Sequence, residues 1–232
     1  MDNSINSFVK LNGLYVNKNA KEAISLYNRL KIKNHPKRFP IFLNGSGYIH
    51  YKTYDILKKE EIQRYVHFDA HTDSVKKYKD GITYLNFVEH IKDLNSIRQI
   101  LLIGTRYKDI LDPKIYQFIS NESNLPEKDV LLTHMSIDLD VLKDIGIVEK
   151  VWENDGTLSL QELINYLNLC KERYNIRSAD ICGIARIFPE PSFSLNNLLN
   201  KPSELKEREL MLEERLKNGV EMVEEIITCL SN

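Results

Sequence analysis

The sequence lacks features that would direct a protein into or across a membrane. It has no run of about 18 apolar residues that could span a bilayer, and its start, Met1 to Asn6, lacks the basic residues and apolar stretch of a secretory signal. Its three cysteines, Cys170, Cys182 and Cys229, lack metal-ligand spacing and lie among apolar residues, which predicts small buried side chains. We therefore expect a cytoplasmic protein without a thiolate metal site.

The sequence also lacks an excess of charge of either sign. Its 32 Lys and Arg residues and 33 Asp and Glu residues give a formal net charge of −1. The densest charged run, residues 204 to 225, interleaves both signs with apolar residues at helical spacing, as on the solvated face of a helix. Nothing in this composition indicates a nucleic acid as partner. Because the chain has no obvious linker, repeat or low-complexity segment, residues 1–232 are expected to form a single domain.

Short apolar runs alternate with helical patterns along the chain. The runs predict buried strands at 40–43, 65–68, 100–103, 131–137 and 181–185. The helical patterns cover 18–31, 51–59, 114–119, the segment after the capping box that starts at Ser159, and about 202–230 with a possible break at Asn218-Gly219. Such alternation predicts an α/β fold with a parallel sheet and helices on both faces. The functional site of such a sheet lies beyond the carboxyl ends of its strands.

Potential metal ligands follow the second of these strands. Asp69, His71 and Asp73 occur at i, i+2 and i+4, so an extended backbone would point all three side chains to one side. A polar loop with a capping aspartate accounts for one of these acids, but poorly for three potential ligands on one face. The spacing therefore favours a metal site.

A second acidic pair, Asp138 and Asp140, follows the strand at 131–137 in the same way. Two carboxylates this close are costly unless a cation neutralises them, although two loop aspartates bonded to backbone amides are an alternative. Together the two motifs offer carboxylate and imidazole ligands, which suit Mn²⁺, Fe²⁺, Co²⁺ or Zn²⁺. The sequence therefore predicts a metal centre at the carboxyl edge of the sheet.

The two motifs together resemble the paired signature of the ureohydrolases, the arginase and agmatinase superfamily. The matching strings are Val-His-Phe-Asp-Ala-His-Thr-Asp at 66–73 and Ser-Ile-Asp-Leu-Asp at 136–140. Segments 100–106, 155–159 and 180–182 are similar to further family segments in the same order, so the resemblance covers about residues 40 to 190. It implies the three-layer arginase-like fold, with a mostly parallel sheet and helices on both faces.

The resemblance also implies a centre of two divalent ions, Mn²⁺ foremost. The family pattern carries the ligand roles onto Asp69, His71, Asp73, Asp138 and Asp140, with Asp73 and Asp138 as bridges. The family's remaining ligand is a histidine in a Gly-Gly-Asp-His loop. His50 is the histidine available there in this sequence, and it is assigned that role against the alternative of a surface histidine.

One departure from the family concerns the substrate. Arginases and agmatinases hold the guanidinium group with a glutamate shortly after the late Asp-Ile, and the aligned residue here is Gly183. The nearest acid, Glu190, either replaces that contact or caps a turn between two prolines. The pattern at 183–189 and the short chain look closer to the arginase-like family UPF0489 and its peptide-arginase relatives, which turn peptide-bound arginine into ornithine.

The residues around the motifs complete the predicted site. Asn86 lies where the family has substrate-loop residues, and His90 is either a proton shuttle or a solvent-facing histidine of a helix. Asp73 or Asp140 would orient a water that the two ions activate. The prediction is hydrolysis of a C–N bond in a linear amidine, with a small guanidino compound or an arginine-containing peptide as partner, and kinship implies a homo-oligomer.

Two other functions remain open at this point. Amide hydrolases of deacetylase type share the fold and an Asp-x-His loop, but they use one catalytic metal backed by paired histidines, and the sequence has no His-His pair. A non-catalytic metal-binding scaffold is the other alternative, because of Gly183 and the irregular loop before His50.

Overall fold

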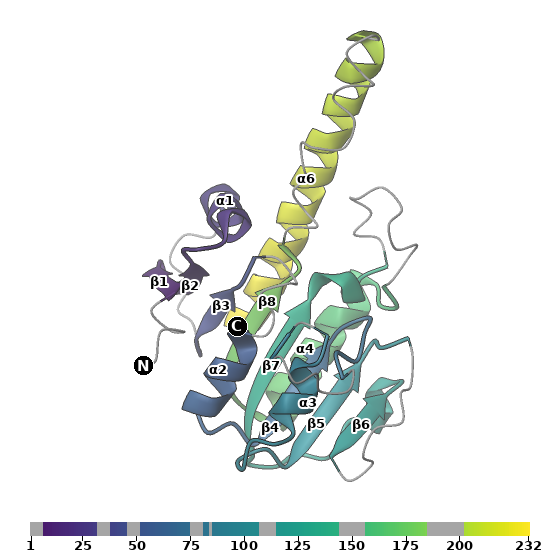
Figure 1. The fold of residues 1–232 in the computed structure, drawn as a ribbon. Coiled ribbons are helices and arrows are strands. Elements are labelled where there is room, and N and C mark those ends of the chain that lie inside the picture. The colour runs from purple at the N-terminus through teal and green to yellow at the C-terminus, as the bar shows by residue number, and fades with distance from the viewer. Residues whose placement is uncertain are drawn as a thin grey trace.

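Eight strands form one sheet in the order β1-β2-β3-β8-β7-β4-β5-β6 (Figure 1). The computed structural model describes residues 7–31, 38–45, 52–74, 81–83, 85–106, 115–143, 156–184 and 202–232. Every pairing in this sheet is parallel except that of β1 with β2. The strands are β1 (Phe8–Leu11), β2 (Leu14–Asn17), β3 (Ile41–Leu43), β4 (Arg64–Phe68), β5 (Gln99–Ile103), β6 (Tyr116–Ile119), β7 (Leu132–Asp138) and β8 (Asn175–Cys182).

Helices cover both faces of the sheet. The helices α1 (Lys21–Arg29), α4 (Leu160–Arg173) and α6 (Pro202–Ser231) contribute apolar side chains to the larger buried core on one face. The helices α2 (Lys52–Lys59) and α3 (Phe87–Ile91) pack on the other face. This arrangement confirms the predicted three-layer α/β fold with a mostly parallel sheet.

Side chains of the central strands alternate between the two cores, as expected for a sheet buried on both faces. Tyr65 and Ile100 join the core under α2 and α3, whereas their neighbours Val66 and Leu101 join the core under α1, α4 and α6. The apolar runs of the sequence are therefore strands covered on both sides.

A buried polar network lies on β7 and β8, on the side that α2 covers. His134 of β7 lies 2.7 Å from Asp180 of β8, measured from Nε2 to Oδ1, and both side chains are fully buried. The other oxygen of Asp180 accepts hydrogen bonds of 3.1 Å from Asn44 and from Thr53 of α2. Because this buried carboxylate has its partners within the chain, it fixes β3, β8 and α2 relative to one another.

The local predictions were wrong at 114–119 and at Asn218-Gly219, and they missed one hairpin. Residues 114–119, expected to be helical, contain strand β6, which pairs in parallel with β5. The helix α6 continues through Asn218-Gly219, where Gly219 is buried in the packing of the helix. The hairpin of β1 and β2 was missed, although its turn residues Asn12 and Gly13 both have positive φ, as the Asn-Gly turns of two-residue hairpins require.

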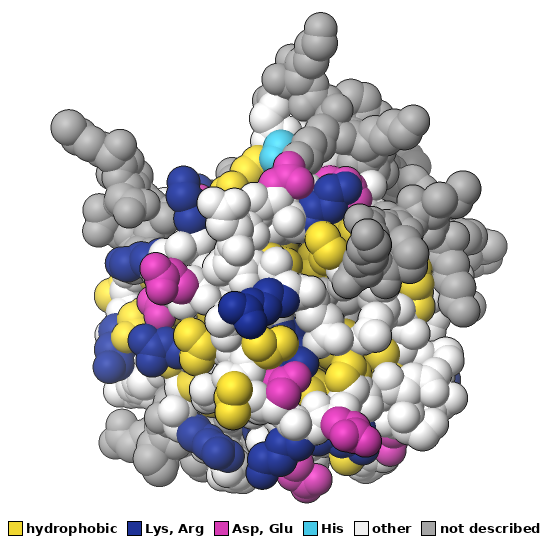
Figure 2. Space-filling view, turned by 90° about the horizontal axis from the view of Figure 1, so that it is seen from below, with side chains coloured by type: hydrophobic (Ala, Val, Ile, Leu, Met, Phe, Trp, Pro, Cys, Tyr) yellow, Lys and Arg dark blue, Asp and Glu magenta, His cyan; other side chains and the backbone are white. Residues whose placement is uncertain are grey.

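The described surface is mixed in character. Figure 2 shows Lys and Arg side chains interspersed with Asp and Glu side chains and with single apolar ones over the described part of one face. Among the helices that the structure describes, none combines the length and the apolar character needed to cross a bilayer.

Candidate metal centre

The two acidic motifs meet at the carboxyl edge of the sheet. Asp69 directly follows β4, and Asp138 is the last residue of β7. The strands β4 and β7 are parallel neighbours, so their carboxyl ends lie side by side. Both side chains are buried, with exposed fractions of 1% for Asp69 and 6% for Asp138.

Backbone amides hold the motifs in place. The Oδ1 atom of Asp69 accepts a hydrogen bond of 2.7 Å from the His71 amide, and Oδ1 of Asp138 accepts one of 3.1 Å from the Asp140 amide. Oδ1 of Asp140 in turn accepts a 3.2 Å bond from the amide of Ala70, in the other motif. This last bond ties the two loops together.

His71 lies between the two motifs at the solvent side. Its Nδ1 is 3.1 Å from Asp140 Oδ2 and 3.4 Å from Asp69 Oδ1. The side chain is 41% exposed, so the group formed by Asp69, His71 and Asp140 is open to solvent on one side.

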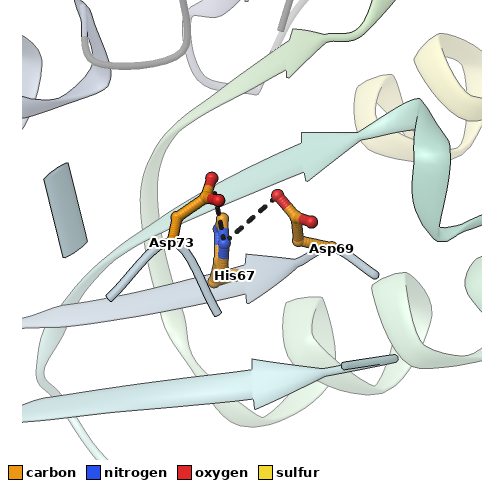
Figure 3. Close-up of side chains that lie close together, drawn as sticks. All are labelled: His67, Asp69 and Asp73. Carbon is orange, nitrogen blue, oxygen red and sulfur yellow. Dashed lines mark ion pairs between the residues drawn. The ribbon is translucent and has the colours of Figure 1, made fainter. Parts of the chain in front are cut away.

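A second histidine, which the sequence analysis did not single out, lies on the inner side of the centre. His67 of β4 has its Nε2 atom 3.3 Å from Asp69 Oδ2 and 4.0 Å from Asp73 Oδ2. Figure 3 shows the two carboxylates on either side of the imidazole. The period of a strand puts His67 on the same face as Asp69, which is the signal that could have identified it.

The electrostatics of the centre oppose a full set of ionised carboxylates. Burial first, then the carboxylates of Asp140, Asp73 and Asp138, raise the pKa of Asp69 well above its usual value. Burial, then Asp138 and Asp140, do the same to the pKa of Asp73. Like charges gathered in a buried place require protons or cations to compensate them.

The donor atoms present fit divalent ions. Two groups, His67-Asp69-Asp73 and Asp69-His71-Asp140, each bring three potential ligand atoms within 4.8 Å of one another. Donors bound to one ion at about 2.1 Å lie about 3 Å apart at right angles and about 4.2 Å apart when opposite. Asp69 belongs to both groups, so its carboxylate lies between two possible metal positions. The predicted bridging by Asp73 and Asp138 stays a prediction.

Gly183, at the position of the family's glutamate, has a steric reason to be glycine. Its φ is +71°, and a Cβ atom placed there would lie 2.3 Å from Asp138 Oδ1 and 3.0 Å from the Leu139 amide nitrogen. A side chain at this position would displace the Asp138 carboxylate. The guanidinium contact of the family therefore cannot come from this position in the observed conformation.

The remaining predicted residues make other contacts or lie outside the described ranges. Asn86 is buried, and its side chain accepts a 2.7 Å hydrogen bond from the Thr83 amide and donates one of 3.2 Å to the Gly81 carbonyl. His90 of α3 is half-buried: its Nε2 atom is buried, and its ring packs edge-on to Tyr54. His50 and Glu190 lie outside the described residues. The metal-ligand role of His50, the substrate roles of Asn86 and Glu190, and the proton-transfer role of His90 stay predictions.

Comparisons with known proteins rest on the fold alone. No family model matches this sequence, and a search of curated protein sequences finds no match either. Solved structures do match: a hypothetical agmatinase from Burkholderia thailandensis is 18% identical with a TM-score of 0.51, covering 66% of this chain and 53% of its own. A candidate agmatinase from Clostridium difficile is 16% identical with a TM-score of 0.55, and the match covers 83% of this chain and 67% of the agmatinase. Arginase from Medicago truncatula is 16% identical with a TM-score of 0.52, and the match covers 80% of this chain and 58% of the arginase.

These similarities establish the arginase-like fold. The chain spans about half to two thirds of the length of the three proteins, from 53% to 67%. At such identities the shared architecture does not carry an activity from one protein to another.

Proposed function

We propose that this protein is a binuclear-metal hydrolase of the ureohydrolase superfamily that cleaves a C–N bond in a guanidino compound or another linear amidine. The observation that carries the proposal is the convergence of the Asp69 and Asp138 motifs at one edge of the sheet, where burial and mutual repulsion raise the pKa of Asp69 and Asp73. The fold shared with agmatinases and an arginase supports it.

The chain offers enough ligands for two ions. Asp69, Asp73, Asp138, Asp140, His71 and His50 would hold them, and a set rich in carboxylates suits Mn²⁺. Bound divalent ions supply Lewis-acid chemistry that activates water at neutral pH.

The other steps fall to side chains of the protein. A carboxylate oxygen of Asp73 or Asp140 would orient the attacking water and take up its proton. The same carboxyl could then return the proton to the amine that leaves. His90 remains a second proton carrier in this proposal, and Asn86 a substrate contact.

The substrate would carry a guanidinium group held by an acid other than the family's glutamate. Because Gly183 leaves no room for a side chain, we propose Glu190 as the carboxylate that pairs with the guanidinium. The resemblance of the segment at 183–189 to the UPF0489 and peptide-arginase group favours peptide-bound arginine or a small guanidino acid, in the cytoplasm.

The test is release of urea by the metal-loaded protein. The Mn²⁺-loaded chain is incubated with arginine, agmatine, guanidino acids and terminally blocked arginine peptides. We expect urea from at least one class, no urea from Asp138→Asn, and full activity from Glu172→Gln, which removes an exposed carboxyl of α4.

Two outcomes would overturn the proposal. Metal-loaded protein that releases no urea across the panel would favour the scaffold. Release of acetate from N-acetylated amines, with one ion bound per chain, would favour the deacetylase-type reaction instead.

A further inference from the structure

His67 occupies an unusual position for an imidazole. It is the fourth residue of β4, a strand whose five residues are all buried, and its side chain is fully buried. Burying a polar ring in a central strand is costly unless both nitrogens have partners. The question is what each nitrogen contacts.

The Nδ1 atom is held by the protein. It forms a 2.9 Å hydrogen bond with the hydroxyl of Tyr65, which also hydrogen-bonds with the side chain of Ser136. Tyr65 stacks against the imidazole with ring centroids 5.4 Å apart, and Phe87 packs against it edge-on at 5.7 Å. One hydrogen bond and two ring contacts therefore fix the orientation of the imidazole.

The Nε2 atom faces the carboxylates. Its distances of 3.3 Å to Asp69 Oδ2 and 4.0 Å to Asp73 Oδ2 both fall in the range expected for donors that share one ion. Figure 3 shows the ring between the two carboxylates, with a dashed line from a ring nitrogen to each. Together the three side chains form one of the two groups with suitable donor spacing.

We infer that His67 is an imidazole ligand of the inner metal position, which it forms with Asp69 and Asp73 while His71 serves the outer one. The inference rests on the metal centre of the proposed function and deepens it. It gives each metal position one imidazole, and the inner imidazole comes from strand β4.

Tyr65 has a positioning role in this arrangement. For Nε2 to bind a metal through its lone pair, Nδ1 must carry the proton and donate it to the Tyr65 oxygen. The Tyr65 hydroxyl can then donate to Ser136. Metal-bound histidines are commonly held in this way by an outer hydrogen-bond partner, whose loss lowers metal affinity roughly 10–100-fold.

The alternative is a purely electrostatic role. His67 could be protonated on both nitrogens and compensate the charge of Asp69 and Asp73 without binding a metal. The two roles predict different protonation states for the metal-loaded protein.

The direct test is NMR of the wild-type chain with ¹⁵N-labelled histidine, titrated with Zn²⁺. We expect His67 and His71 to shift on saturation, with His67 neutral, Nδ1 protonated and Nε2 metal-bound. A His67 ring that stays doubly protonated or does not shift at saturation would overturn the inference.

Variants give a second measurement, by titration calorimetry with Mn²⁺. His67→Phe should lower the affinity of one of two ions by more than the roughly 100-fold upper value for an outer partner. Tyr65→Phe should lower it roughly 10–100-fold. Phe87→Leu disturbs the packing of the same ring without removing a donor, and should change the affinity less than Tyr65→Phe. Equal Mn²⁺ affinity of wild type and a folded His67→Phe would contradict the inference.

These results separate the inference from the proposed function. Metal-bound His67 in a protein that releases no urea leaves the ligand assignment standing and removes the reaction. Urea release by a protein whose His67 does not respond to metal leaves the reaction standing and removes the ligand assignment.

Discussion

The two ends of strand β4 treat buried charge in opposite ways. At its start, Arg64 is 1% exposed, donates a 2.9 Å hydrogen bond from Nη1 to Asp129 Oδ1, and stacks over Tyr174 with 4.0 Å from Cζ to the ring centroid. At its end, Asp69 meets three more carboxylates and two imidazoles. The charge of Arg64 is paired with that of Asp129, whereas the carboxylates around Asp69 all have the same sign of charge.

The pKa directions express this difference. Hydrogen bonds from Arg64 lower the pKa of Asp129, whereas burial and neighbouring carboxylates raise the pKa of Asp69 and of Asp73. An end of a strand with paired charges is built for stability. Crowded carboxylates at the end of a strand favour the binding of cations, and they lower the stability of the metal-free protein.

The largest effect on stability is expected at the start of the strand. Arg64→Ala leaves a carboxylate without its partner and removes the stacking on Tyr174, which should lower the free energy of unfolding by about 3 kcal/mol. This is the lower end for a buried pair because Asp129 is 34% exposed and partly screened. Urea denaturation measures the change, and Mn²⁺ affinity should stay the same. A loss below about 1 kcal/mol would remove the contrast between the two ends.

The next effect concerns Gly183 beside Asp138. Gly183→Ala forces a side chain into positive φ and against Asp138 Oδ1, so we expect a loss of about 1–3 kcal/mol together with weaker Mn²⁺ binding. Gly81→Ala is the matched control, because Gly81 has φ +102° and a Cβ there meets nothing within 4 Å. It should cost only the backbone strain, about 1 kcal/mol, and leave Mn²⁺ affinity unchanged. If both variants bind Mn²⁺ like wild type, Gly183 does not shape the site.

The pH dependence of the metal-free protein should differ between the two ends. The raised pKa of Asp69 and Asp73 gives stability that is present below the ordinary carboxyl pKa of about 4 and is lost as pH rises through the folded value. The lowered pKa of Asp129 gives stability that is present above that value and is lost as pH falls.

Melting curves in EDTA between about pH 5 and 8 therefore isolate the site. We expect the metal-free Tm to fall with rising pH, and Mn²⁺ to stabilise most at the alkaline end. Asp129→Asn should lower the whole curve without changing its slope over this range. A metal-free Tm that rises with pH would contradict the repulsion described at the site.

The smallest effect is expected in the central polar network, where the chain supplies the partners of a buried carboxylate. Thr53→Val keeps the shape of the side chain but removes one hydrogen bond to Asp180, which should cost about 1 kcal/mol. Differential scanning calorimetry can measure it. A loss of several kcal/mol would mean that Asp180, like the carboxylates of the metal centre, has little other compensation.

The sequence allowed the buried strands and the two acidic motifs to be predicted, because parallel strands covered on both faces read as apolar runs that end at polar residues. It did not distinguish helix from strand at 114–119, where six residues are too few for periodicity to decide. The two-residue turn at Asn12-Gly13 carried a clear signal that the analysis passed over.

His67 shows why the site was only partly predictable. In the string Val-His-Phe a single histidine reads as a buried core residue. Asp73, expected to extend the alternation of Asp69 and His71, instead has φ of +47°, and its carboxylate lies beside the ring of His67. A turn of this kind comes from the three-dimensional packing, so residue spacing could place His67 on the face of Asp69 but not beside Asp73.

The central claim is that divalent cations compensate the carboxylates at the end of β4. The most direct test is the number of Mn²⁺ ions bound per folded chain, measured by calorimetry together with elemental analysis after dialysis. We predict two ions for wild type and a loss of ions for Asp69→Asn. A folded wild-type chain that binds none would contradict the claim.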